Sequence, residues 1–164
     1  AVIHHISLPP GEFRKQDSSG YIVDFFQNKL DPNQHPYFAE IADQKVSSHF
    51  LITRSGSLVQ FVSTRKKAWH AGISEFLGRE KCNDFSIGIE LEGDGDTPFE
   101  ATQYQALTSL IQKLTNSYLD LQFAGHSDIA PERKTDPGIH FDWKKFQKET
   151  GISAKKLPFG LDSR

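Results

Sequence analysis

Apolar and polar residues alternate along the chain in runs that predict strands and helices in turn. Residues 1–7, AVIHHIS, are rich in β-branched side chains and predict a strand. A loop with two prolines and two glycines follows at 8–20, and two short helices are predicted around 21–29 and 37–43. Two apolar runs in 47–62 flank the sequence RSGS, which is typical of a β-hairpin.

The second half of the chain continues this pattern after a polar, irregular segment at 63–84. Residues 85–93, FSIGIELEG, alternate strictly, so we predict a strand with one apolar and one polar face. Residues 100–118 predict a helix because apolar residues recur at helical spacing. A short strand at 121–125 and a short capped helix that begins at Asp142 complete the pattern. The helical stripe consists of Tyr104, Leu107, Leu110, Ile111 and Leu114.

The pattern predicts a single α/β domain with a central mixed β-sheet flanked by helices. The 164 residues, of which 37% are hydrophobic, are sufficient for one core. We assign the domain to residues 1–150 and expect residues 151–164 to form a loosely held C-terminal tail.

Charge and cysteine content narrow the possible partners and locations. The net charge of −2 gives no electrostatic argument for binding nucleic acid or an anionic membrane. No apolar run reaches the ~18 residues of a membrane span. Cys82 is the only cysteine, so no intrachain disulfide is possible, and with no visible signal peptide this favours a reducing, cytoplasmic location. The chain lacks methionine and begins inside its first predicted strand, which is typical of a trimmed N-terminus.

Ionisable side chains gather in residues 125–138, GHSDIAPERKTDPG, where two prolines and two glycines exclude a regular helix or strand. His126 and Asp136 are separated by nine residues here, and an imidazole with a carboxylate is a workable pair of zinc ligands. A solvated, hydrogen-bonded loop is the alternative. A zinc site would require a third protein ligand from elsewhere in the chain.

Two other regions could complete such a site. His4 and His5 are adjacent on the first predicted strand, so only one of them can face a given site, and the residues alone leave both possible. Glu90 shares the polar face of 85–93 with Gly88. Its carboxylate would either accept a proton from a metal-bound water or lie on the solvent face of an antiparallel edge strand.

Four blocks of sequence occur in order along the chain: HHISLPPGEF, AWHAG, GREKCNDFSIGIELEG and GHSDIAPERKTDPG. Together they resemble the N-acetylmuramoyl-L-alanine amidase family, and in particular its cytoplasmic branch that acts on 1,6-anhydro muropeptides. The similarity extends from His4 to about Phe146. The family shares a central mixed β-sheet flanked by helices with a bacteriophage lysozyme and with the peptidoglycan recognition proteins, in agreement with the pattern above.

The resemblance implies a zinc hydrolase that cleaves the amide between N-acetylmuramic acid, expected in its 1,6-anhydro form, and L-alanine during peptidoglycan recycling. It assigns one zinc per chain to His4, His126 and Asp136, the general base to Glu90, and a stabilising positive charge to Lys134. The expected partner is a muropeptide substrate, with no nucleic acid and no membrane, and the protein is expected to be a monomer. A non-catalytic muropeptide-binding module of the same fold is the alternative, which the loss of a zinc ligand would indicate.

Other residues are candidates for substrate binding or for structural roles. Trp69 and His70 lie on a glycine-containing loop, where an exposed aromatic ring suits the apolar face of a sugar. His49 lies in an apolar run and is expected to be buried and hydrogen-bonded. His5 stands where the family often has asparagine, and strand geometry predicts that it faces away from His4. The basic residues that would pair with carboxylates of a stem peptide are Lys45, Arg79 and Lys81.

Overall fold

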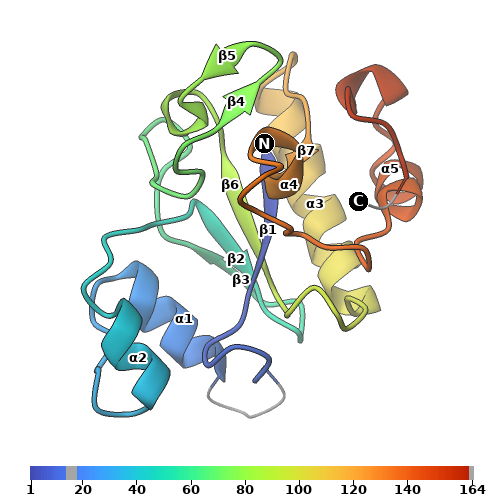
Figure 1. Ribbon diagram of the computed structural model, residues 1–164. Coiled ribbons are helices and arrows are strands. Elements are labelled where there is room, and N and C mark those ends of the chain that lie inside the picture. Colours follow the sequence, from blue (N-terminus) through green and yellow to red (C-terminus); the bar gives the residue numbers. More distant parts are fainter. Residues whose placement is uncertain (14–17, 163–164) are drawn as a thin grey trace.

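The computed structural model describes residues 1–13 and 18–162, which fold around a five-stranded sheet of order β3-β2-β6-β1-β7 (Figure 1). β6 (Gly88–Glu92) lies at the centre, with β1 (Val2–Ile6) and then β7 (Ala124–Gly125) on one side. On its other side lie β2 (Phe50–Ile52) and β3 (Leu58–Gln60). All neighbouring strands are parallel except β2 and β3, so the sheet is mixed, as predicted.

The register of the central strands gives the sheet two different faces. Ile3 is level with Ile89, and the next pair along the two strands is His4 with Glu90. Leu51 of β2 is also level with Glu90. Because side chains alternate along each strand, His4, Glu90 and Leu51 share one face, and Ile3 and Ile89 share the other.

The face with Ile3 and Ile89 packs against α3 (Ala101–Ser117) and α5 (Trp143–Thr150) in the largest hydrophobic cluster. The amide of Gln103, in the first turn of α3, donates to the main-chain carbonyl of Glu92 at 3.0 Å. This bond ties the helix to the end of β6. The predicted helical stripe of α3 is buried in full, and this is confirmed for Tyr104, Leu107, Leu110, Ile111 and Leu114.

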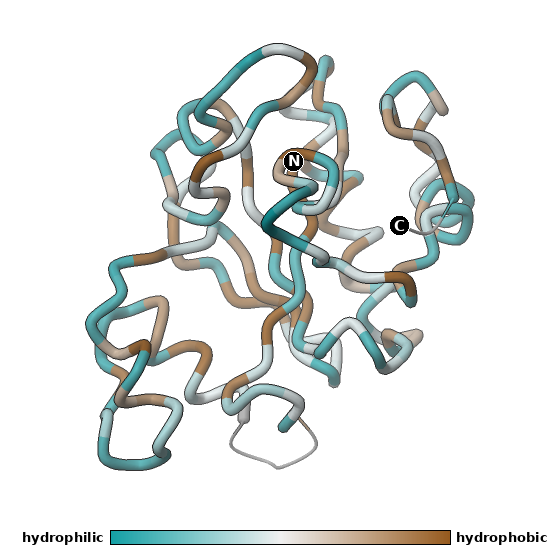
Figure 2. Tube along the Cα trace, in the orientation of Figure 1, coloured by the Kyte–Doolittle hydropathy of each residue, from teal (hydrophilic) through white to brown (hydrophobic). Residues whose placement is uncertain are grey.

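The opposite face is covered at the Leu51 side by α1 (Ser18–Phe26) and α2 (Pro36–Ile41), which lie together apart from α3 and α5 (Figure 1). The turn between α1 and α2 is hydrophilic, and apolar residues lie along the helices themselves (Figure 2). A cavity of about 550 Å³ remains between these helices and the part of the sheet that holds His4 and Glu90.

Several predicted elements are confirmed, with shifted ends. Gly56 turns the predicted hairpin with a φ of +84°, a conformation that glycine adopts at little cost. Asp142 caps α5, since its side chain accepts a hydrogen bond from the Lys145 main-chain nitrogen at 2.8 Å. The predicted loop at 8–20 holds for residues 8–13, whereas α1 already begins at Ser18. Its middle, 14–17, lies outside the described residues.

Other predictions were wrong in detail. The segment 63–84 contains a small hairpin, β4 (Glu75–Phe76) with β5 (Arg79–Glu80), and the 3₁₀ turn η1 (Cys82–Asp84). The segment is polar and shows no alternation of apolar and polar residues, so the hairpin could not be predicted from the sequence. The loop 125–138 begins with one helical turn, α4 (His126–Ile129), where only irregular structure was expected.

The segment after α5 packs more closely than predicted. It contains the 3₁₀ turn η2 (Ala154–Lys156), and the side chains of Ile152 and Leu157 are buried in the main hydrophobic cluster. These apolar contacts hold the segment against the sheet, so it is not a loose tail up to Leu157. Among the described helices, none has the length and apolar character needed to cross a bilayer.

Candidate active site

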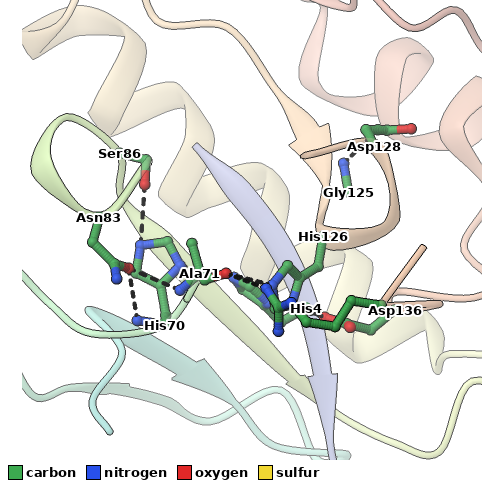
Figure 3. A network of polar contacts seen from close by, with 10 residues as sticks. His4, His70, Ala71, Asn83, Ser86, Gly125, His126, Asp128 and Asp136 are labelled. Carbon is green, nitrogen blue, oxygen red and sulfur yellow. Dashed lines mark hydrogen bonds and ion pairs between the residues drawn. The ribbon is translucent and has the colours of Figure 1, made fainter. Parts of the chain in front are cut away.

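His4, His126 and Asp136 converge on one point beside the sheet (Figure 3). His4 Nδ1 lies 3.0 Å from His126 Nδ1 and 2.9 Å from Asp136 Oδ2. His126 Nδ1 lies 3.0 Å from the same carboxylate oxygen. All three residues are buried. The structure thus brings together the two loop residues and selects His4 as their neighbour.

The geometry of these atoms fits a divalent metal ion. Two ring nitrogens and one carboxylate oxygen point their lone pairs into the same space. Zinc bonds of about 2.0–2.2 Å in a tetrahedral site place neighbouring ligand atoms about 3.3–3.6 Å apart, close to the observed triangle. Two histidines and one carboxylate are also a donor set that zinc hydrolases use, with a fourth position left for water or substrate.

Strand pairing brings the two histidines together. Ile3 of β1 is level with Gly125 of β7, and His4 and His126 each follow one member of this pair. The Asp128 carboxylate accepts a hydrogen bond from the Gly125 main-chain nitrogen at 2.7 Å, which fixes the turn into α4. The loop returns to this point because the main-chain nitrogen after His126 donates to the Asp136 carbonyl at 2.8 Å.

His5 packs on the other side of β1. A Cβ atom on Gly95 would lie 2.7 Å from His5 Nε2, so the ring lies against the loop that follows β6. Burial lowers the pKa of His5. Although His5 contributes to the wall of the cavity, its ring is outside the ligand triangle, in agreement with the predicted alternation.

Burial and hydrogen bonding set the charges within the triangle. Burial lowers the pKa of His4 to about 4, although the adjacent Asp136 carboxylate acts in the opposite direction. Burial alone would raise the pKa of Asp136, but the His126 and His4 rings, each with a nitrogen within 3.0 Å of its carboxylate, outweigh burial and hold this pKa below its usual range. A neutral His4 beside an ionised Asp136 at neutral pH is the state that binds a metal cation.

Glu90 lies beside the triangle on the central strand. It is 6% exposed and level with His4 on the same face. Burial raises the pKa of its carboxyl well above the usual value, the negative Asp136 adds to this, and Lys134 opposes it. The central position of β6 rules out the alternative of a solvent face on an edge strand.

The cavity above the triangle contains several of the other predicted residues. Its wall includes Glu90, Lys134, Trp69 and His70, opposite apolar residues of α1 and α2. The strongly hydrophilic segment 131–135 crosses in front of the sheet here (Figure 2). Trp69 is 55% exposed, and Lys67 Nζ lies 3.9 Å from the centre of its ring.

The predicted basic residues lie at different places. Lys81 lines a groove of about 1080 Å³ that shares Trp69 and Arg133 with the cavity above the triangle. Lys45 is exposed, and its chain neighbours Gln44 and Val46 line the cavity above the triangle. Arg79 is elsewhere: its guanidinium lies 3.8 Å from the centre of the Phe85 ring and lines a separate cavity.

His49 is buried and hydrogen-bonded, as predicted. Its Nδ1 accepts from the Gly88 main-chain nitrogen at 3.0 Å, and its Nε2 donates to the Lys66 carbonyl at 3.0 Å. This histidine supports the start of β6 and has no nitrogen left for a ligand.

Sequence reasoning missed the residues that support the triangle from behind. Asp128 fixes the turn before His126, and the others belong to the segment 70–73 and its contacts. In the sequence, the only signal for the residues around this segment was Gly88. A Cβ atom at position 88 would lie 2.5 Å from Cγ of His70, so glycine provides the space for this ring. The missed residues are Ala71, Asn83, Ser86, Asp128 and Arg133.

Comparison with known proteins identifies a group of similar chains. The family described as N-acetylmuramoyl-L-alanine amidase matches residues 1–139. The 1,6-anhydro-N-acetylmuramyl-L-alanine amidase AmpD of Haemophilus influenzae is 53% identical over 148 residues, which are 88% of this chain and 78% of the relative.

Solved structures give the same result. A crystal structure of a selenomethionine derivative of AmpD superposes with a TM-score of 0.85 at 51% identity, and covers 90% of this chain and 82% of its own. The amidase AmiD from E. coli, in complex with its substrate anhydro-N-acetylmuramic acid-L-Ala-D-gamma-Glu-L-Lys, has a TM-score of 0.66 at 33% identity. That match covers 93% of this chain and 57% of AmiD.

Gly88→Ala should destabilise the fold by about 1–3 kcal/mol, because the new methyl group would displace the His70 ring. Urea unfolding with a chelator present would measure this without a contribution from bound metal. Gly20→Ala in α1 is the matched control, since no atom lies within 4 Å of the added Cβ, and it should be neutral or stabilising by up to about 1 kcal/mol. Equal stabilities for the two variants would contradict the close contact between Gly88 and His70.

Proposed function

The chain belongs to the N-acetylmuramoyl-L-alanine amidase family, and we propose that it is a zinc-dependent hydrolase of anhydro muropeptides. The bond cleaved is the amide between 1,6-anhydro-N-acetylmuramic acid and L-alanine, and the reaction serves peptidoglycan recycling in the cytoplasm. The observation that carries the proposal is the triangle of His4, His126 and Asp136 with Glu90 beside it. The activity named for the similar AmpD, and the anhydro substrate bound by AmiD, support the choice of substrate.

His4, His126 and Asp136 would hold one zinc ion. When bound, zinc would polarise the scissile carbonyl and make a water molecule nucleophilic at neutral pH. The protein's contribution is to hold three ligand atoms in place before the metal arrives. Strand pairing and the short turn of α4 do this with little freedom left in the backbone.

Glu90 would act as the general base and then as the general acid. It would take a proton from the attacking water and return it to the nitrogen of the departing L-alanine. Its buried position raises the pKa of its carboxyl well above the usual value, a direction that suits a group that must hold a proton and return it. The proximity of Asp136 and Lys134 shows that its charge state depends on both neighbours.

Lys134 would stabilise the oxyanion that forms at the scissile carbonyl. It lies in the cavity two residues before Asp136, and its positive charge acts on both His4 and Glu90. Trp69 offers an exposed ring to the apolar face of the sugar. Lys45 and Lys81 would pair with carboxylates of the stem peptide.

Purified protein should contain one zinc per chain after dialysis, and His126→Ala should lose it together with the activity. Elemental analysis and hydrolysis of an anhydro-muramyl peptide measure the two quantities. His140→Ala is the matched control, because His140 lies outside the residues that line the cavity, and it should retain both. Stoichiometric zinc in His126→Ala would overturn the ligand assignment.

Glu90→Gln should keep its zinc and lose turnover by roughly 10²–10⁴-fold, since the amide side chain cannot accept the proton. Single-turnover hydrolysis and metal content should be measured on the same sample. Glu149→Gln, an exposed substitution of the same kind in α5, should behave as wild type. Full activity in Glu90→Gln, or loss of its zinc, would each contradict the role as base.

The protein should hydrolyse anhydro-muramyl tripeptide faster than it releases peptides from intact sacculi. Lys45→Ala and Lys81→Ala should each raise KM for the tripeptide about two- to fivefold, the range expected for an exposed ion pair, with zinc content unchanged. Lys113→Ala on the opposite side of the sheet is the control and should leave KM unaltered. Faster release from sacculi would indicate a wall-degrading amidase instead.

A further inference from the structure

The two histidines of the triangle are supported by one dipeptide, His70–Ala71, which does not itself contact the metal position. His4 Nε2 lies 2.9 Å from His70 Nδ1. His126 Nε2 lies 3.0 Å from the Ala71 carbonyl oxygen. In both ligands, therefore, the nitrogen that faces away from Asp136 meets this dipeptide (Figure 3).

Counting hydrogens fixes the direction of these bonds. A neutral imidazole carries one N–H, and a ring that offers Nδ1 to a metal must carry it on Nε2. His126 then donates to the Ala71 carbonyl, and His4 donates to His70 Nδ1. His70 must in turn carry its hydrogen on Nε2, which lies 3.1 Å from the Ser86 hydroxyl oxygen. The result is a chain of donors that runs from His4 through His70 to Ser86.

The dipeptide is held rigidly. Asn83 Oδ1 accepts hydrogen bonds from the main-chain nitrogens of His70 at 3.0 Å and Ala71 at 2.8 Å. Arg133 donates to the Ala71 carbonyl at 2.7 Å and to the Ile73 carbonyl at 2.8 Å. The missing side chain at position 88 leaves the space that the His70 ring fills. Each of these contacts limits where the acceptor for a ligand histidine can lie.

We propose that His70 is a positioning residue that fixes the tautomer and orientation of His4 through a hydrogen bond, with Ser86 fixing His70 in turn. This inference rests on the proposed zinc site and goes beyond it. The sequence groups His70 with Trp69 as a candidate for substrate binding, whereas this inference gives His70 a role toward the metal. Outer hydrogen bonds of this kind usually change metal affinity by about 10–100-fold when they are removed.

Zinc affinity tests the proposal directly. His70→Ala should weaken zinc binding, measured by competition with a chelator of known affinity, by about 10–100-fold. His70→Asn should recover most of that loss, because its amide oxygen can take the place of Nδ1 as acceptor for His4. His140→Ala is the matched histidine control and should bind zinc as wild type does.

The outcomes separate this proposal from the one on which it rests. If wild-type protein does not bind zinc, the proposed function fails, and this inference fails with it. If wild type binds zinc and His70→Ala binds it equally well, only the role of His70 is overturned. Equal weakening in His70→Ala and His70→Asn would also overturn it, since the acceptor would then make no difference.

Histidine tautomers in the zinc-loaded wild-type protein give an independent test that needs no substitution. Long-range ¹H–¹⁵N correlation spectra should show His4, His126 and His70 protonated on Nε2. Ser86→Ala should leave His4 in this tautomer but change the ring signals of His70. A hydrogen on Nδ1 of His70 in the zinc-loaded protein would overturn the proposal, even if the His70 variants fail to fold.

Discussion

The parallel pairing of β1 with both β6 and β7 determines where His4, Glu90 and His126 lie. β1 is level with Glu90 on one side and with the residue before His126 on the other, so His4 stands between a carboxylate and an imidazole. A shift of β1 by one residue would turn His4 to the opposite face of the sheet. Ile3 and His5, the residues before and after it, would then face the cavity. The packing of Ile3 against α3 therefore also keeps His4 in its place beside His126 and Asp136.

This arrangement places an unusual number of polar groups inside the protein. His4, His126, Asp136 and Glu90 are all at most 8% exposed. Burying such groups is costly unless each has a partner. The three members of the triangle are partners of one another, and the rings have second partners behind them. Polar groups at this density reduce stability, and the large hydrophobic cluster on the other face of the sheet acts in the opposite direction.

Local pattern was sufficient for α3, whose apolar residues recur at helical spacing, and for β1, which is rich in β-branched side chains. The proposed metal ligands could not be chosen from local pattern alone. Alternation established that only one of His4 and His5 faces the triangle, and the family resemblance selected His4. Glu90 shows the limit most clearly: its strand alternates like a half-exposed one, and only the long-range pairing with β1 and β2 buries it. Likewise, His70 lies 66 positions after His4 along the chain, and no local pattern relates them.

The contacts that hold residues 70–71 limit which changes in chain length this region can accept. Irregular surface segments generally accept insertions and deletions readily. In residues 70–88, however, three separate positions contact the ring or the main chain of His70. They are Asn83, Ser86 and Gly88. A change in length would separate them, except at the tip of the β4–β5 hairpin, where a side chain on Gly78 would meet no other atom within 4 Å. Length variation in this region should therefore be confined to that tip, although most of the segment has no regular structure.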